Sequence, residues 1–381
     1  MIEVANRLQT VEEYYFSKKL REVGALMASG KPIISLGIGS PDLAPPAKVL
    51  EAISESFKSP SAHKYQSYQG LPELREAMAE FYKTQFSVNL DPASEILPLM
   101  GSKEGIMHIS MAYLNEGDSV LIPNPGYPTY QSVTNLVGAK GILYNLDAEN
   151  NWMPDFEALE KLDLSKVKLM WVNYPHMPTG AKPTKSIFED LVAFAKRHDI
   201  LIVNDNPYSF ILNDAPKSLL EVEGAKEVCL ELNSLSKTFN MAGWRVGMVM
   251  GSTEHINNIL KVKSNMDSGM FYGIQKGAIE ALKCSKSWYS ELNAVYEVRR
   301  KLVWELADAL NCTYDKNASG LFIWAKLPEG EKSEAFIDKI LMEKDIFITP
   351  GTVFGTQGEG YVRFSLCATS SAIRECIARV K

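Results

Sequence analysis

The chain has 381 residues, too many for one compact core, so we expect a large domain and a smaller one. Hydrophobic residues make up 46% and charged residues 23%, and the formal net charge is -6. This composition is ordinary for a soluble globular protein and argues against nucleic acid as a partner. No apolar run in the sequence is long enough for a membrane span. The five cysteines and five histidines are dispersed without a CxxC pair, which argues against a disulfide framework or a metal site and favours a reduced, cytoplasmic protein.

Strand and helix signals alternate through the middle of the chain. Residues 101–114 and 184–199 are predicted helices, the second with Ser186 and Glu189 at capping-box spacing. Short apolar runs rich in β-branched residues predict strands at 119–125, 167–175, 200–208, 228–234 and 245–251. Such runs are typical of strands buried on both faces. We therefore predict an α/β fold with a mostly parallel central sheet, whose ligands bind at the carboxyl ends of the strands.

After about residue 280 the pattern changes. A long helix is predicted over 285–310, followed by two strands and two further helices, at 320–327, 360–366, 333–344 and 370–380. Helical spacing places apolar residues on one face of the long helix: Trp288, Leu292, Val295, Leu302, Leu306 and Leu310. We expect a large ligand-binding domain over 45–275. The amino-terminal residues 1–44 are expected to join 276–381 in a smaller α+β domain.

The segment "NSLSKTFNMAGWRVG", residues 233–247, carries a lysine just after a strand. Ser234 ends the predicted strand, and Ser236, Lys237 and Arg245 lie in the loop beyond it. Hydroxyl and apolar neighbours could partly desolvate Lys237 and lower its pKa, giving the neutral amine that carbonyl chemistry needs. A lone lysine in such a loop is usually a solvated residue, so this motif gains weight only from the others.

Two further strand ends carry an acid and an anion-binding turn. Asp205 closes the strand in "NDNPY", and Tyr208 lies in the following turn; a buried carboxylate there needs a cation, for which a protonated pyridine nitrogen is a candidate. In "GSKEG", residues 101–105, Ser102 and Lys103 open a helix directly after a strand, as at phosphate sites. Alone, each pattern has an ordinary structural explanation, as a stabilised turn and a serine N-cap.

Taken together, these motifs define one ligand. Arg245 and the serine hydroxyls could complete a phosphate site, Tyr127 in "NPGYPTY" could stack on a flat ring, and Tyr208 could reach its phenolic oxygen. A planar pyridine with a phosphate, an acidic partner and a lysine for its aldehyde is pyridoxal 5'-phosphate.

The ordered motifs give the chain a family resemblance over nearly its whole length. They are "GxPD", "YxxxxGxxxLRE", "GSKEG", "PxYPxY", "PTG", "DxxY", "SxSKxFxMxGxRxG" and "GYVRFS". In this set the chain resembles class I/II, fold-type I, PLP-dependent aminotransferases. The resemblance implies transfer of an amino group between an L-amino acid and a 2-oxo acid, by a ping-pong cycle through the Lys237 aldimine.

The resemblance also implies roles for individual residues. Lys237 would form the internal aldimine and shuttle the proton, while Asp205 would keep the pyridinium protonated. Arg363 in "GYVRFSL" matches the arginine that grips the substrate α-carboxylate, and Gly39 matches the glycine whose backbone N–H assists it. Tyr65 matches the tyrosine that reaches the phosphate of a neighbouring subunit. We therefore expect a homodimer with shared active sites and small-molecule substrates.

The stretch "NYPHMPTG", residues 173–180, departs from the family pattern. Family members typically have Asn-Pro-Thr-Gly, whose asparagine donates a hydrogen bond to the phenolic oxygen of the cofactor, whereas this chain has Met177. A thioether donates nothing. One expectation is an internal aldimine that keeps its proton to higher pH. The other is that Met177 packs against the ring edge while a different donor replaces the asparagine.

Substrate choice and reaction type stay open at this stage. A PLP-dependent β-lyase or a related eliminating or replacing enzyme is the alternative on the same fold. No arginine occurs in 261–271, which argues against one form of aspartate specificity, while Lys103 matches a lysine that meets a distal carboxylate in another subgroup. Aromatic and apolar residues that could line a side-chain pocket are Tyr14, Tyr15, Phe16, Ile38 and Tyr68, although core or interface packing is equally open to each.

Overall fold

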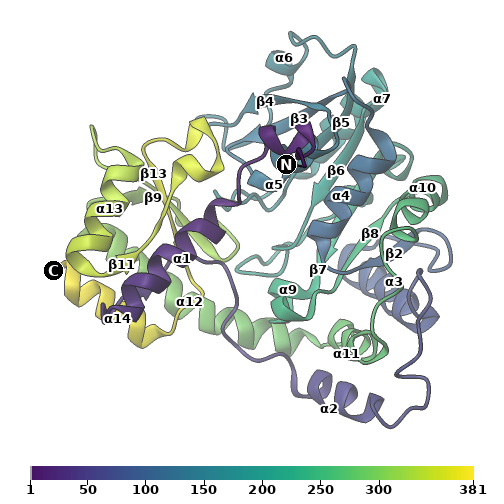
Figure 1. Ribbon diagram of the computed structural model, residues 1–381, viewed down its shortest axis with the longest axis horizontal. Helices are drawn as coiled ribbons and strands as arrows, with labels where there is room; N and C mark the ends of the chain where they lie inside the picture. Colours follow the sequence, from purple (N-terminus) through teal and green to yellow (C-terminus); the bar gives the residue numbers. More distant parts are fainter. Residues whose placement is uncertain (1) are drawn as a thin grey trace.

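The structure, a computed structural model, describes residues 2–381. Its centre is a seven-stranded sheet in the order β2-β8-β7-β6-β5-β3-β4 (Figure 1). The strands are β2 (Ile96–Leu99), β3 (Ser119–Asn124), β4 (Lys140–Asn145), β5 (Val167–Val172), β6 (Leu201–Asp205), β7 (Cys229–Ser234) and β8 (Gly247–Met250). All neighbouring pairs are parallel except β2–β8 and β7–β8. The predicted mostly parallel α/β fold is confirmed.

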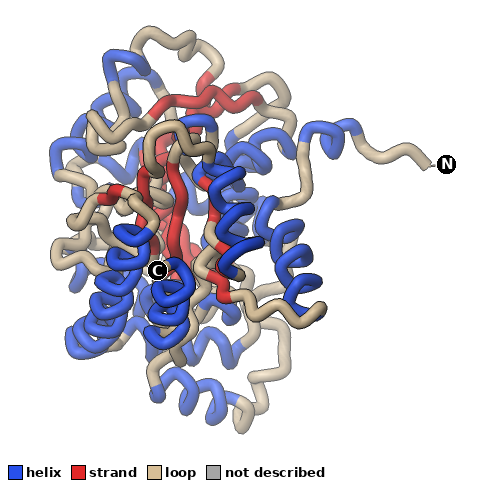
Figure 2. Tube along the Cα trace, turned by 90° about the vertical axis from the view of Figure 1, so that its left-hand side faces the viewer, coloured by secondary structure: helices blue, strands red, loops and turns tan. Residues whose placement is uncertain are grey.

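Helices cover both faces of this sheet, as Figures 1 and 2 show. On one face α4 (Ser102–Tyr113), α5 (Pro128–Leu136) and α10 (Thr253–Lys263) share an apolar core with the strands. The opposite face is covered by α3 (Pro72–Phe86), α7 (Lys185–His198) and α11 (Tyr272–Leu282). The remaining helices of this part are α2 (Ala47–Ser56), α6 (Phe156–Leu159), α8 (Ala225–Val228), α9 (Leu235–Thr238), η2 (Leu219–Glu221) and η3 (Ala242–Trp244).

A second, smaller sheet lies to the left in Figure 1. Its order is β12-β13-β10-β9, all antiparallel, in strands β9 (Thr313–Tyr314), β10 (Phe322–Lys326), β12 (Thr349–Pro350) and β13 (Tyr361–Ser365). The helices around it are α12 (Lys286–Ala309), α13 (Ser333–Lys344), α14 (Ser370–Val380), η4 (Gly351–Phe354) and η5 (Thr356–Gly358).

The amino-terminal segment contacts both parts of the molecule: η1 (Asn6–Thr10) lies against α5, whereas α1 (Tyr15–Ala28) and β1 (Ile34–Ser35) pack beside the smaller sheet. The short β1 pairs in parallel with β11 (Ile346–Phe347), and Val23 of α1 shares a small core with Leu341. Within residues 2–381, no helix is both long and apolar enough to cross a membrane.

Three local predictions were wrong. The N-cap of α7 is Thr184, whose hydroxyl accepts from the Ile187 N–H, because the helix begins earlier than the Ser186 spacing indicated. Lys237 stands in α9, a single helical turn that Ser234 caps, and not in an irregular loop. Val295 of α12 is exposed, because the apolar face of this long helix turns away from it toward Leu292 and Leu302.

Candidate active site

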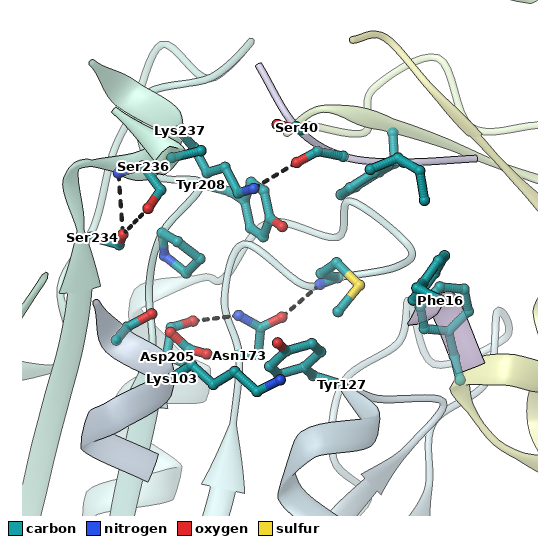
Figure 3. A pocket seen from close by; sticks show the side chains of 18 of the residues that line it. Phe16, Ser40, Lys103, Tyr127, Asn173, Asp205, Tyr208, Ser234, Ser236 and Lys237 are labelled. Atoms are coloured by element: carbon teal, nitrogen blue, oxygen red, sulfur yellow. Dashed lines mark hydrogen bonds between the residues drawn. The ribbon is translucent and has the colours of Figure 1, made fainter. Parts of the chain in front are cut away.

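The carboxyl ends of β5, β6 and β7 open into a cavity of about 310 Å³, closed on the other side by the smaller sheet and the amino-terminal segment. It is lined by every residue predicted for the site except Tyr65: Gly39, Ser102, Lys103, Tyr127, Met177, Asp205, Tyr208, Ser234, Ser236, Lys237, Arg245 and Arg363. Tyr65 is 90% exposed and does not line it. Figure 3 shows the lining side chains facing one another.

Lys237 points into the cavity from α9. Its Nζ donates to the Gly39 backbone oxygen at 2.6 Å, and no carboxylate within residues 2–381 pairs with it (Figure 3). Burial disfavours the ammonium form and lowers the Lys237 pKa to about 8, although the nearby Cys367 opposes this effect. Near neutral pH a usable fraction of this amine is therefore unprotonated, as attack on a carbonyl requires.

Asp205 lies at the floor of the cavity, at the end of β6. Its Oδ2 accepts from the Tyr130 hydroxyl at 3.0 Å, whereas its buried Oδ1 has no hydrogen-bond partner among the described residues. Burial raises the Asp205 pKa to about 7, against the opposing effects of the Tyr130 hydrogen bond and Lys237. An orphaned buried carboxylate oxygen fits a bound cation such as a protonated ring nitrogen.

Tyr130 is a site residue that the sequence analysis missed. Its ring stacks on Trp171 at 4.9 Å between centroids, which fixes the hydroxyl under Asp205. The signal was present as the second tyrosine of "PxYPxY", but only the first, Tyr127, was given a role. Tyr127 packs edge-on against Tyr130, with ring centroids 5.6 Å apart.

An anion cradle is formed at the start of α4. Gly101, with φ of 90°, precedes Ser102, and a Cβ on this glycine would lie 2.0 Å from the Arg245 Nη2 atom. Only a glycine lets the guanidinium lie against the helix N-terminus. Beside it, at the end of β7, the Ser234 hydroxyl donates to the Ser236 hydroxyl at 2.8 Å. Free helix N–H groups, two hydroxyls and an arginine are a donor set that suits a phosphate dianion.

Arg363, on β13, is the second arginine of the cavity. One Nη donates to the Gly37 oxygen at 2.9 Å, while the buried Nε has no partner in the part of the chain that the structure describes. The guanidinium packs on Phe322, Phe354 and Phe16, at 3.9, 4.6 and 5.4 Å from their ring centroids. Burial lowers its pKa to about 10, so it stays charged at neutral pH and can bind a carboxylate.

The turn after β5 brings Met177 to this arginine. Asn173 accepts the Met177 N–H at 2.8 Å through its side-chain oxygen, and its amide donates to the Asp205 backbone oxygen. The Met177 sulfur lies 3.4 Å from the other Arg363 Nη and is almost fully buried. The thioether is therefore a weak acceptor for the guanidinium. Asn173 was not predicted as a site residue.

Lys103 and Tyr208 complete the polar lining. Lys103 Nζ lies 4.5 Å from the centroid of the Tyr14 ring, and partial burial, then Arg245, lower its pKa. Tyr208 is buried against Phe322, at 5.9 Å between ring centroids, and burial raises its pKa. Of the aromatic and apolar residues considered for a side-chain pocket, Tyr14, Phe16 and Ile38 line the cavity, whereas Tyr15 and Tyr68 do not.

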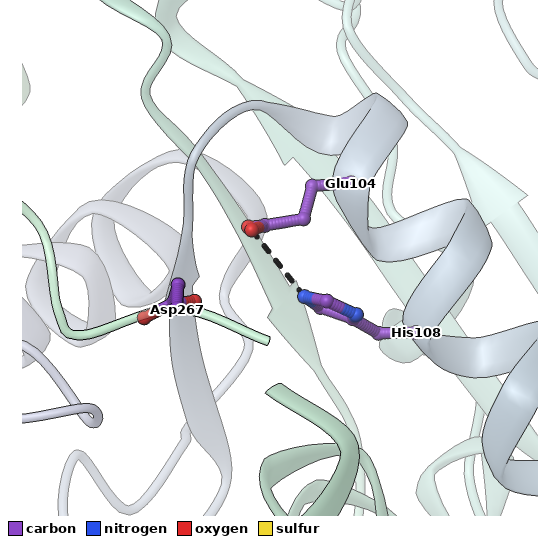
Figure 4. A group of neighbouring side chains, drawn as sticks. All are labelled: Glu104, His108 and Asp267. Atoms are coloured by element: carbon purple, nitrogen blue, oxygen red, sulfur yellow. Dashed lines mark ion pairs between the residues drawn. The ribbon is translucent and has the colours of Figure 1, made fainter. Parts of the chain in front are cut away.

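A separate cluster of Glu104, His108 and Asp267 has ligand atoms close enough for a metal ion (Figure 4). Its two carboxylates already have partners, however, although neither ring nitrogen of His108 makes a hydrogen bond within residues 2–381. The Glu104 carboxylate lies 3.3 Å from the His108 Nε2 and accepts the Met100 N–H, and the buried Lys263 ammonium lies 2.6 Å from Asp267. The lysine supplies the positive charge that a metal would bring. The prediction that the chain has no metal site stays a prediction.

Comparison with known proteins gives a consistent result. The family described as aminotransferase class I and II matches residues 31–380. The chain is 40% identical to the LL-diaminopimelate aminotransferase of Dehalococcoides mccartyi, over 100% of this chain and 98% of that protein.

Solved structures agree with this match. BacF from Bacillus subtilis superimposes with a TM-score of 0.95 at 35% identity, covering 100% and 98% of the two chains. The aromatic aminotransferase of Pyrococcus horikoshii superimposes with a TM-score of 0.87 at 32% identity, covering 94% and 97%.

Proposed function

The chain belongs to the class I and II aminotransferases, and from this premise we propose which substrates it takes and what each site residue does. It is a pyridoxal 5'-phosphate-dependent enzyme that moves an amino group between an amino acid and a 2-oxo acid. The eliminating alternative has no support among these relatives.

The cavity fits this cofactor because each of its groups finds a complementary residue. Bound there, pyridoxal phosphate supplies an aldehyde for the amine and a ring that withdraws electrons from the substrate Cα. We assign its phosphate to Ser102, Lys103, Ser234, Ser236 and Arg245, with Tyr65 reaching it from a second copy of the chain. The unpartnered Oδ1 of Asp205 carries this proposal, since it holds the proton at the ring nitrogen.

Lys237 is the proposed proton carrier at the substrate Cα. Its pKa of about 8 lets the amine both accept and release a proton near neutral pH. Tyr127 stacks on the ring, Tyr208 donates to its phenolic oxygen, and Met177 packs at its edge. Arg363 and the Gly39 N–H bind the α-carboxylate of the substrate, the arginine through its free Nε and an Nη that gives up the weak sulfur contact.

We propose an aromatic or large apolar amino acid as the donor. Asp205 is the only acidic side chain among the described lining residues, and its carboxylate is already assigned to the ring nitrogen of the cofactor. The remaining wall near Arg363 is apolar and includes Phe16, Leu20, Ile38 and Phe354. LL-diaminopimelate has both an ammonium and a carboxylate at its distal end: Lys103 could meet the carboxylate, but among the described lining residues no side-chain carboxylate besides Asp205 is left for the ammonium. Lys103 is suited to the distal carboxylate of a 2-oxo acid such as 2-oxoglutarate.

LL-diaminopimelate is the competing donor, because curated relatives that are 38–40% identical to this chain carry it in their names. Initial rates with 2-oxoglutarate as acceptor decide between them. We expect kcat/KM for L-phenylalanine and L-leucine to exceed that for LL-diaminopimelate at least about tenfold, the effect of roughly 1.4 kcal/mol. The reverse order would refute the apolar donor and leave the aminotransferase assignment intact.

We also propose that the enzyme is a cytoplasmic homodimer. Tyr65 is 90% exposed and supports a dimer, since its proposed role requires a second copy of the chain. Tyr65 and Phe271 line the same surface hollow, and Phe271 is also partly exposed.

We propose a large domain over 45–275 and a small one over 1–44 plus 276–381. The apolar cores support this division in the main: one core lies within the first range, another lies almost wholly in the second, and a third lies in the first range apart from residues 278–282 of α11.

A further inference from the structure

One short segment contacts both Arg363 and Lys237, the two groups of the cavity that are proposed to meet the substrate. Residues 37–44, here called the substrate strap, run between the two sheets and contain Gly39 and Ser40 of the cavity lining. The Gly37 oxygen accepts from Arg363, and the Gly39 oxygen accepts from Lys237. The position of this backbone therefore sets where a substrate carboxylate lies relative to the catalytic amine.

The first half of the strap is fixed by the smaller sheet. Thr349 donates to the Gly37 oxygen at 2.8 Å, and the Ser365 hydroxyl donates to the Ile38 oxygen at 2.7 Å. Gly39 itself is constrained sterically, since a Cβ there would lie 2.2 Å from the Phe322 ring. Among residues 2–381, the only side chain that donates a hydrogen bond to Gly39 is Lys237. That bond cannot be a permanent anchor, because the same amine is needed for chemistry.

The second half of the strap is held by an ion pair. Asp42 receives a bidentate fork from Arg299 of α12, at 2.6 and 2.8 Å, and the same guanidinium donates to the Leu366 oxygen at 3.1 Å. The Arg299 side chain is 5% exposed and that of Asp42 is 28% exposed. Leu366 follows β13, the strand that carries Arg363. Arg299 therefore ties the strap directly to the strand of the carboxylate-binding arginine.

We propose that Asp42 and Arg299 are positioning residues for substrate binding: their ion pair holds the Gly39 backbone at the correct separation from Arg363. The inference rests on the proposed roles of Gly39 and Arg363. Both the amino donor and the 2-oxo acid acceptor present the same α-carboxylate to these groups. Loosening the strap therefore weakens the binding of both substrates by a similar factor, while the phosphate cradle on the large sheet is untouched.

The test measures both half-reactions in the full-length holoenzyme carrying Asp42→Asn or Arg299→Lys. Losing a charge-assisted bidentate contact predicts a rise of roughly tenfold in KM for donor and acceptor alike. We expect kcat to change less than about threefold and the dissociation constant for pyridoxal phosphate less than about twofold, since neither residue contacts reacting atoms. Asp42→Glu keeps the carboxylate and restores most of the KM.

Glu305→Gln is the matched control, because Glu305 stands on α12 like Arg299 but pairs at 2.7 Å with Lys381, at the end of the chain, and not with the strap. Its KM values stay unchanged. If Asp42→Asn does not fold, Arg299→Lys and Asp42→Glu supply the same comparison. Unchanged KM values would overturn the proposal, and so would a loss of kcat, cofactor affinity and thermal stability that accompanies the rise in KM. Arg363→Lys tests the carboxylate site itself, and an unchanged KM there refutes both the site and the inference built on it.

Discussion

Replacing Asp205 by asparagine tests whether this buried acid is kept for a cationic ligand. In the unliganded chain, burial raises its pKa from 3.8 to about 7, so ionising it costs on the order of 4 kcal/mol. The folded state thus holds this proton more tightly than the unfolded state does. The stability that the bound proton contributes is fully present below pH 3.8 and is lost progressively as pH rises to about 7.

The Asp205→Asn variant would carry no such penalty, and its amide leaves a donor unsatisfied just as the protonated carboxyl of wild type does, because Oδ1 has no partner among the described residues. The Tyr130 hydrogen bond survives, because the amide oxygen accepts as the carboxylate does. Unliganded Asp205→Asn is therefore close to wild type in stability below pH 3.8, where both side chains are neutral, and more stable than wild type at pH 8. The difference between the two proteins changes by about 3 kcal/mol between pH 5 and pH 8.

The assay is denaturant unfolding of both proteins at pH 5 and pH 8, with and without pyridoxal phosphate. At pH 8 the cofactor stabilises wild type more than the variant, since only wild type pairs the ring nitrogen with an ionised acid. A stability difference that does not vary with pH would show that the carboxylate is not penalised by burial. Equal stabilisation of both proteins by the cofactor would show that Asp205 does not hold the ring nitrogen.

Three further predictions concern the cofactor site. The rate at which the unliganded enzyme captures pyridoxal phosphate rises with pH, with a midpoint near the Lys237 pKa of about 8, because the amine loses its proton there. Stopped-flow absorbance measures this rate. A midpoint near the ordinary lysine pKa of 10.5 would contradict the claim that burial lowers the Lys237 pKa. Met177→Asn restores a donor, so the midpoint of the pH-dependent absorbance change of the bound cofactor falls by roughly one to two units; an unchanged midpoint means that another group already supplies the hydrogen bond. Gly101→Ala weakens cofactor binding at least about tenfold, because the new Cβ meets Arg245 and the backbone has positive φ. Gly30→Ala is the control for backbone strain, since Gly30 also has positive φ but has nothing within 4 Å of its Cβ position. Equal cofactor affinity of the two variants would show that Arg245 does not belong to the phosphate site.

The sequence was sufficient for the parts of the site that depend on strand ends. Asp205 and Ser234 end buried strands, and Ser102 opens a helix after one, so a parallel sheet brings them together whatever the loop details. The fold class followed from the same alternation of apolar runs and helical periodicity.

The missed residues act through contacts distant in the sequence. Tyr130 supports Asp205 across 75 residues, and Arg299 reaches Asp42 across 257. Tyr130 belongs to the "PxYPxY" motif, but the motif does not show which residue its hydroxyl supports, and Arg299 has no local pattern, because an arginine on a long amphipathic helix is ordinary. The position of Met177 against Arg363 depends likewise on the packing of the large sheet against the smaller one. Only the three-dimensional arrangement shows that the thioether faces a guanidinium.

Borohydride reduction of the holoenzyme, followed by peptide mapping, tests the central claim most directly. Lys237 and Lys103 both line the cavity, and both have lowered pKa values, so either amine could in principle meet an aldehyde. The account predicts a phosphopyridoxyl group on Lys237 alone, with Lys103 unmodified. A label on Lys103, or no label on a protein that has bound the cofactor, would contradict it.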